Sequence, residues 1–193
     1  MSEEVKKTYT IIAGINGAGK TSLYNVMKAD DRIALGERIN IDEIVGRYGD
    51  WRDSFLQIRA AREAMRMIGD YIDAGVCFHQ ETTLPGKTIL RQVQKAKAKG
   101  YRVRLFYVGV DSVEVALARV HKRMEQGGHG LDDDIICRRF DKMKQNIEAI
   151  YPLCDKAVFY DNTTRFRQIA FFKNKIMLDC TPNLPQWFSE LFD

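Results

Sequence analysis

The chain has 193 residues, of which 45% are hydrophobic and 29% charged, an ordinary composition for a globular protein. Its length fits one domain with room for a small appended lid, and its net charge of +4, with acidic residues interleaved, does not demand a nucleic-acid-binding surface. No apolar run is long enough to span a membrane, and four cysteines without a Cys-x-x-Cys pair indicate neither a zinc site nor a disulfide framework. With a charged N-terminus, the chain is expected to be cytoplasmic.

Predicted strands and helices alternate along the chain. The apolar periodicity and the turn residues predict, in order, a strand at 8–13, a helix ending near 28, a strand at 37–41, a helix at 54–73, a strand at 76–81, a helix at 85–99, a strand at 103–110, helices at 113–126 and 133–150, a strand at 157–160, and a hairpin of 169–172 with 175–178.

Such alternation predicts an α/β fold, a three-layer sandwich whose five-stranded, mostly parallel sheet has helices on both faces. A ligand of this fold binds beyond the carboxyl ends of the strands. The residues expected there are the loop 14–21 after the first strand, Asp42 after the second, and Glu81 with Thr83 after the third.

Residues 14–21 read Gly-Ile-Asn-Gly-Ala-Gly-Lys-Thr, which is the Walker A pattern between a predicted strand and a predicted helix. Glycines let successive backbone N–H groups turn inward as an anion nest, and the helix adds the positive end of its dipole. Lys20 can reach the β- and γ-phosphates, and the Thr21 hydroxyl can ligate Mg²⁺. The loop therefore predicts ATP and magnesium, bound by Gly14, Asn16, Gly17, Ala18, Gly19, Lys20, Thr21 and Ser22.

Two carboxylates at predicted strand ends favour phosphoryl transfer to a small acceptor. Asp42 is the candidate base that orients the acceptor hydroxyl and takes its proton, although a helix N-cap would explain the same position. Glu81, with Thr83 nearby, can grip acceptor hydroxyls or magnesium-bound water; turn chemistry before Pro85 is the alternative.

A basic segment at 119–139 predicts a small helical lid. Arg119 and Arg123 share one helix face, a glycine-rich stretch at 127–130 follows, and Arg138 and Arg139 come next. A closing lid needs such a hinge, and arginine forks bind phosphate oxygens in pairs. Two solvated helices with surface charge would give the same pattern.

The chain resembles the zeta-toxin family of P-loop kinases, in its small single-domain branch. The resemblance covers roughly residues 8–165. It rests on the Walker A loop, on Ile39 to Ile44, on Glu81 to Leu84, and on the later segments Arg119 to Arg123, 127–129, Arg138 to Phe140 and Tyr160 to Asn162.

The resemblance implies an adenylate-kinase-like fold and an enzyme that phosphorylates UDP-N-acetylglucosamine on the sugar 3′-hydroxyl. By motif position Lys20 and Thr21 would hold ATP and magnesium, Asp42 would be the base, and Arg119 would touch the transferred phosphate. Glu81 and Thr83 would bind the amino-sugar nucleotide. A small helical antitoxin is a possible protein partner.

The chain departs from the family pattern at two places. It has Glu81-Thr82-Thr83 where the toxins have Glu-Gly-Thr, and His129 stands near the position of a second phosphate-binding arginine. His129 is therefore a candidate substrate-binding residue, and Arg123, Arg138 or Arg139 could replace the arginine. These differences leave the acceptor open. A nucleotide or polynucleotide-end kinase and an ATP-binding module controlled by a partner are the alternatives.

Overall fold

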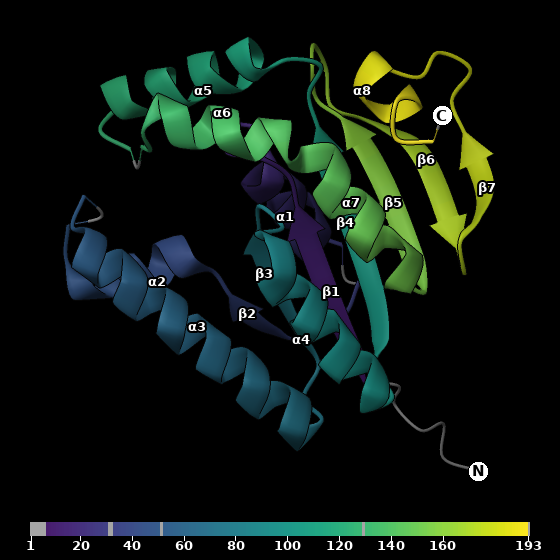
Figure 1. Cartoon of the computed structure of the whole chain (residues 1–193), viewed down its shortest axis with the longest axis horizontal. Helices are drawn as coiled ribbons and strands as arrows, with labels where there is room; N and C mark the ends of the chain where they lie inside the picture. The colour runs from purple at the N-terminus through teal and green to yellow at the C-terminus, as the bar shows by residue number, and fades with distance from the viewer. Residues whose placement is uncertain (1–6, 31–32, 51, 129, 193) are drawn as a thin grey trace.

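The computed structural model describes residues 7–30, 33–50, 52–128 and 130–192. A single sheet runs through the molecule in the order β2-β3-β1-β4-β5-β6-β7, and its first five strands are parallel (Figure 1). The strands are β1 (Thr8–Ala13), β2 (Glu37–Ile39), β3 (Phe78–Thr82), β4 (Arg102–Gly109), β5 (Lys156–Asp161), β6 (Arg167–Lys173) and β7 (Ile176–Cys180).

Helices cover both faces of the sheet and complete the expected three layers (Figure 1). None of the described helices is long and apolar enough to cross a bilayer. The helices are α1 (Lys20–Lys28), α2 (Ile41–Tyr48), α3 (Ser54–Ala74), α4 (Gly86–Ala98), α5 (Val113–Glu125), α6 (Asp133–Asp141), α7 (Met143–Ile150) and α8 (Gln186–Ser189), with a 3₁₀ turn at Tyr151–Leu153.

The core is divided by the sheet into two buried clusters. Successive strand residues point to opposite faces, so Ile11 joins the cluster under α2, α3, α4, α7 and α8, whereas Ile12 joins the one under α1, α5 and α6. β1 and β4 in the centre are buried along nearly their whole length. Near-continuous apolar runs are what parallel strands covered on both faces require.

The five parallel strands and the terminal hairpin are confirmed, and the hairpin is part of the same sheet. β6 pairs antiparallel with β5, and β7 pairs antiparallel with β6, which extends the sheet to seven strands. The predicted helix at 133–150 is two helices that meet at Lys142.

The second strand is shorter than predicted, and this moves the helix cap. β2 ends at Ile39, and the Asn40 side chain accepts a 2.9 Å hydrogen bond from the Asp42 backbone N–H. The cap of α2 is therefore Asn40, so the alternative explanation of Asp42 as an N-cap is wrong. Asp42 lies in the first turn, where a carboxylate interacts favourably with the helix dipole.

The C-terminal segment closes over the sheet. Trp187 and Phe188 of α8 are buried among the aromatic rings of β4 and β5, with Trp187 packed against Tyr107 and Phe188 against Phe159. The Trp187 indole donates a 3.2 Å hydrogen bond to the buried carboxylate of Asp161 at the end of β5. The C-terminal segment thus contacts the carboxyl end of β5, on the side of the sheet where the phosphate loop lies.

We expect Trp187→Ala to lower the free energy of unfolding by about 3–5 kcal/mol, because it leaves a large cavity and removes a buried hydrogen bond. Phe55→Ala is the matched control, since Phe55 is 69% exposed; it should change stability by less than about 0.5 kcal/mol. Chemical denaturation of both variants measures the free energy of unfolding. An equal decrease in the two variants would contradict a stabilising role for the buried Trp187.

Candidate active site

The loop between β1 and α1 is folded as a phosphate cradle by two left-handed glycines. Gly17 has φ +80° and Gly19 has φ +108°, and a Cβ on Gly17 would lie 2.4 Å from the Ala116 carbonyl oxygen. A side chain is thus excluded both by conformation and by the close approach of α5. Helix α1 begins directly after the loop, so its unpaired N–H groups face the same space.

Side chains from distant segments brace this loop. Arg119 of α5 donates to the Gly17 carbonyl at 3.4 Å and to the Thr163 carbonyl at 3.1 Å. Arg139 of α6 donates to the Asn16 side-chain oxygen at 2.6 Å, and Asn162 donates to the Ala18 carbonyl at 2.8 Å. The loop is therefore held in shape by α5, α6 and the end of β5.

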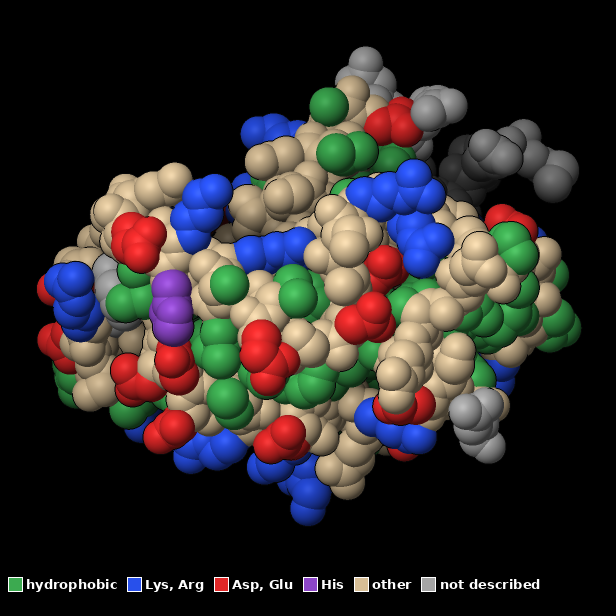
Figure 2. Space-filling model, turned by 90° about the horizontal axis from the view of Figure 1, so that it is seen from above, with side chains coloured by type: hydrophobic (Ala, Val, Ile, Leu, Met, Phe, Trp, Pro, Cys, Tyr) green, Lys and Arg blue, Asp and Glu red, His purple; other side chains and the backbone are tan. Residues whose placement is uncertain are grey.

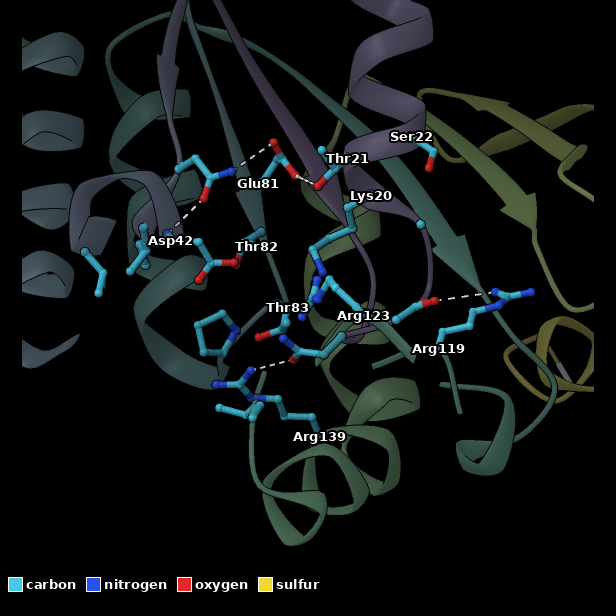
Figure 3. Close-up of a pocket in the computed structure, with 18 of the residues that line it drawn as sticks. Lys20, Thr21, Ser22, Asp42, Glu81, Thr82, Thr83, Arg119, Arg123 and Arg139 are labelled. Atoms are coloured by element: carbon cyan, nitrogen blue, oxygen red, sulfur yellow. Dashed lines mark hydrogen bonds between the residues drawn. The ribbon is translucent and has the colours of Figure 1, made fainter. Parts of the chain in front are cut away.

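Glu81, at the carboxyl-end side of β3, is the centre of a buried hydrogen-bond network. One carboxylate oxygen accepts from Arg38 at 2.6 Å and from Asn40 at 3.1 Å. The other accepts from the Thr21 hydroxyl at 3.0 Å (Figure 3). The Arg38 guanidinium also lies 3.6 Å from the centre of the Tyr24 ring. The network connects the first turn of α1, the strand β2, and the cap of α2.

A cavity of about 700 Å³ opens beyond the carboxyl ends of the parallel strands. It brings together most of the residues that the sequence predicts, from the loop, α2, β3, α5 and α6 (Figure 3). The predicted residues that line it are Asn16, Gly17, Gly19, Lys20, Thr21, Ser22, Asp42, Glu81, Thr83, Arg119, Arg123 and Arg139.

The other predicted residues lie elsewhere. Gly14 and Ala18 belong to the loop but do not line the cavity. Gly14 donates its N–H to the Thr82 carbonyl at 3.3 Å, and Ala18 is fully buried. The Arg138 side chain is exposed and donates to the Asp134 carbonyl of its own helix. His129 lies outside the described residues.

The arginines of the predicted lid differ in their surroundings. Arg119 holds backbone carbonyls, whereas Arg123 and Arg139 act electrostatically on the Lys20 ammonium from across the cavity. The α5 and α6 helices that carry them pack against each other. A contact between Arg119 and the transferred phosphate stays a prediction, as does a closing motion of the lid.

The charges in the cavity are arranged in two groups. The cations are Lys20, Arg119, Arg123 and Arg139, and the anions are Asp42 and Glu81, which interact with Lys20 (Figure 3). Lys20 keeps some exposed surface, yet protein atoms surround its ammonium group, which donates to the Ile15 carbonyl at 3.1 Å. Burial lowers the pKa of Lys20 to about 8, although Asp42 and Glu81 raise it.

The residues around Thr21 fit a magnesium ion. Its hydroxyl and the Glu81 carboxylate are hard oxygen donors that lie 3.0 Å apart at the start of α1. Among the described residues, no group of three or more histidine, cysteine or acidic side chains could hold a metal ion. A magnesium ion here would therefore share its coordination between these oxygens, bound phosphates and water, as Mg²⁺ usually does.

Three residues that organise the site were not predicted from the sequence. Arg38 and Asn40 hold Glu81, and Asn162 holds the loop. Asn40 and Asn162 stand in the segments on which the family resemblance rests. Their roles follow only from the three-dimensional structure, which shows the residues that they contact. The buried partner of Arg38 is 43 residues away along the chain.

Figure 2 looks at the molecule from the side toward which β1 points. Basic and acidic side chains are interspersed on this face.

Comparison with known proteins identifies the family. The model of the family described as Zeta toxin matches residues 1–175. The chain belongs to the zeta toxin family. An uncharacterized protein of Haemophilus influenzae is 32% identical over 127 residues, which cover 66% of this chain and 88% of that protein.

Solved structures share the fold of this zeta toxin family member. A structure of the PezAT toxin–antitoxin system of Streptococcus pneumoniae matches with a TM-score of 0.66 and 15% identity, over 100% of this chain and 84% of that chain. A structure of AvrRxo1-ORF1:-ORF2 with ATP matches with a TM-score of 0.64 and 15% identity, over 99% of this chain. The present chain spans 64% of that AvrRxo1 chain.

We expect nucleotide binding to take up protons at about pH 8.5, because phosphates beside Lys20 favour its charged form and raise a pKa that is about 8 in the free protein. The affinity should accordingly fall as the pH rises through 8. Titration calorimetry in two buffers of different ionisation enthalpy measures the uptake. Lys20→Arg, which stays charged, should abolish it, and an unchanged uptake in that variant would assign the proton elsewhere.

Proposed function

We propose that this zeta toxin family member is an ATP-dependent kinase that transfers the γ-phosphate to a hydroxyl of a small acceptor. The observation that supports this best is the single cavity in which the phosphate loop with Lys20 faces the carboxylate of Asp42. A nucleotide-binding module needs the loop alone. A carboxylate across the same cavity gives an acceptor hydroxyl a place beside the terminal phosphate.

The proposed step breaks the bond between the γ-phosphorus and the oxygen that bridges it to the β-phosphorus, and forms a bond to the acceptor oxygen. Asp42 orients the acceptor hydroxyl and takes its proton. Lys20 neutralises charge on the β- and γ-phosphates, and Arg123 and Arg139 stabilise the charge that spreads over the transferred group. Bound magnesium supplies further neutralisation of the phosphate oxygens.

The proposed roles divide the cavity between nucleotide and acceptor. Glu81 contacts Thr21, so we place it beside the metal and its water, where it also orients Asn40 at the cap of α2. The acceptor side then consists of Asp42, Thr83 and the polar residues Gln57 and Thr82, all of which line the cavity. The first acceptor to test is a UDP-amino sugar, as the family resemblance implies.

A protein partner belongs to the same proposal. PezAT is described as a toxin–antitoxin system, and AvrRxo1-ORF1 was solved together with ORF2. By this likeness we propose that a small protein binds the present chain and keeps the site silent. The product of a neighbouring small open reading frame should then co-purify with the chain and suppress its ATP turnover; full turnover in its presence would contradict the proposal.

We expect incubation with ATP, Mg²⁺ and UDP-N-acetylglucosamine to give a phosphorylated nucleotide sugar in the mass spectrum. ATP turnover without this product would exclude UDP-N-acetylglucosamine as the acceptor and leave the kinase site intact. A screen of other hydroxyl-bearing metabolites for ATP-dependent phosphorylation would then identify the acceptor. A steep salt dependence of acceptor affinity would instead indicate a polynucleotide.

Asp42→Asn should bind ATP normally and lose about 10²–10⁴-fold of transfer, because the amide keeps the shape of the side chain but accepts no proton. Asp50→Asn is the matched control, since Asp50 is an exposed residue just after α2 and does not line the cavity. Single-turnover transfer separates chemistry from product release. Wild-type transfer by Asp42→Asn would remove Asp42 as the base.

A further inference from the structure

A second cavity, of about 200 Å³, extends the first one between the sheet and the helices α3 and α4. Those two helices contact each other and lie side by side (Figure 1). We call this space the side pocket and define it by Ile39, Ala64, Met65, Ile68, Gln80 and Ile89.

The side pocket is continuous with the proposed kinase site. Ile41, Ala61, Glu81, Thr82 and Pro85 line both cavities. Of these, Ala61 and Pro85 come from the two sides of the opening, on α3 and just before α4. A molecule that places a hydroxyl beside Asp42 can therefore extend a substituent into the side pocket.

The walls of the side pocket are mainly apolar. Ile39, Ala64, Ile68 and Ile89 are buried, whereas Met65 is 46% exposed and covers the rim. An engineered apolar cavity of about 150 Å³ is known to take up benzene, so 200 Å³ is room for a ring-sized group. Burying such a group is favourable in proportion to its apolar area.

Gln80 is the most deeply buried of the polar residues in these walls, which also include Glu81, Thr82, Thr88 and Gln92. It lies in the middle of β3, it is only 5% exposed, and among the residues that the structure describes its side-chain oxygen has no hydrogen-bond partner. A buried carboxamide oxygen without a donor destabilises the fold, because it has lost its water and gained nothing in return. Leucine in its place would pack against the same neighbours without that cost. The Gln80 oxygen is therefore an acceptor that a donor on a bound ligand would satisfy.

We propose that the side pocket is a specificity subsite for the acceptor, which accepts a ring-sized apolar group carrying an N–H or O–H donor for Gln80. This inference rests on the proposed kinase function and deepens it. The acceptor is then a hydroxyl compound whose recognised substituent is larger than a methyl group and is not purely hydrocarbon.

Indole and benzofuran are a matched pair of probes for this subsite. Their fused rings have the same shape, but indole offers an N–H donor and benzofuran offers none. We expect the wild-type protein to bind indole about 3–10-fold more tightly than benzofuran, the range of one net hydrogen bond. Methyl chemical shifts of Ala64 and Ile89 report both the dissociation constants and the location.

Gln80→Leu should abolish the preference for indole while it raises the melting temperature, because the unpaired buried oxygen is gone. Gln168→Leu is the matched control, since Gln168 is an exposed glutamine on β6, away from both cavities; it should keep the preference. If Gln80→Leu folds poorly, Ala64→Val offers a second route: it narrows the pocket and should weaken both probes.

Three results would overturn the proposal: equal affinities for the two probes, a preference that survives Gln80→Leu, or no shifts at Ala64 and Ile89. Once an acceptor is known, indole should raise its KM and leave the KM of ATP unchanged. If no acceptor is ever phosphorylated, the proposed kinase function fails, while the probe pair still decides whether the side pocket binds such groups.

Discussion

The site depends on how one buried carboxylate is held. Glu81 comes from β3, the neighbour of the edge strand β2, and its two oxygens accept hydrogen bonds from Arg38, Asn40 and Thr21. A carboxylate removed from water is costly unless charges and hydrogen bonds compensate it. Its partners belong to β2, to the cap of α2 and to the first turn of α1. The hydrogen bonds to Glu81 therefore hold α1, β2 and the start of α2 in place around this carboxylate.

This constraint relates the two halves of the cavity. Thr21 belongs to the nucleotide side, whereas Asn40 caps the helix that carries Asp42. Glu81 contacts both, so the distance between the phosphate loop and the proposed base does not depend on a flexible loop. Precise placement of the reacting groups is the main resource of a phosphoryl-transfer enzyme, because there is little covalent chemistry for the protein to perform.

The phosphate loop is stabilised from the opposite direction by the C-terminal half. Asp161 accepts hydrogen bonds from Trp187 and from Thr163, and the Thr163 carbonyl in turn accepts from Arg119, which also holds Gly17. The terminal helix is therefore linked to the loop through a chain of side chains. A core residue far from the cavity can in this way support the site.

Much of this arrangement could be predicted from the sequence, and the failures have physical reasons. The phosphate loop has a local signature, and the period of apolar residues separates buried strands from amphipathic helices. The division of the helix 133–150 at Lys142 depends on local backbone geometry. The cap at Asn40 has a sequence signal, an asparagine followed three residues later by Glu43, but the predicted strand extends past it. The ion pair between Arg38 and Glu81 joins residues that are 43 apart in the chain. The unpaired oxygen of Gln80 likewise depends on how β3 packs against segments far away in the sequence.

The most direct measurement of the central claim is a crystal structure with Mn²⁺ and a non-hydrolysable ATP analogue. We expect the β- and γ-phosphates to lie within the loop, on Lys20, and an anomalous manganese peak to appear beside the Thr21 hydroxyl and the Glu81 carboxylate. We also expect the γ-phosphate to point toward Asp42. A metal bound away from Glu81, or a nucleotide whose phosphates lie outside the loop, would contradict this claim.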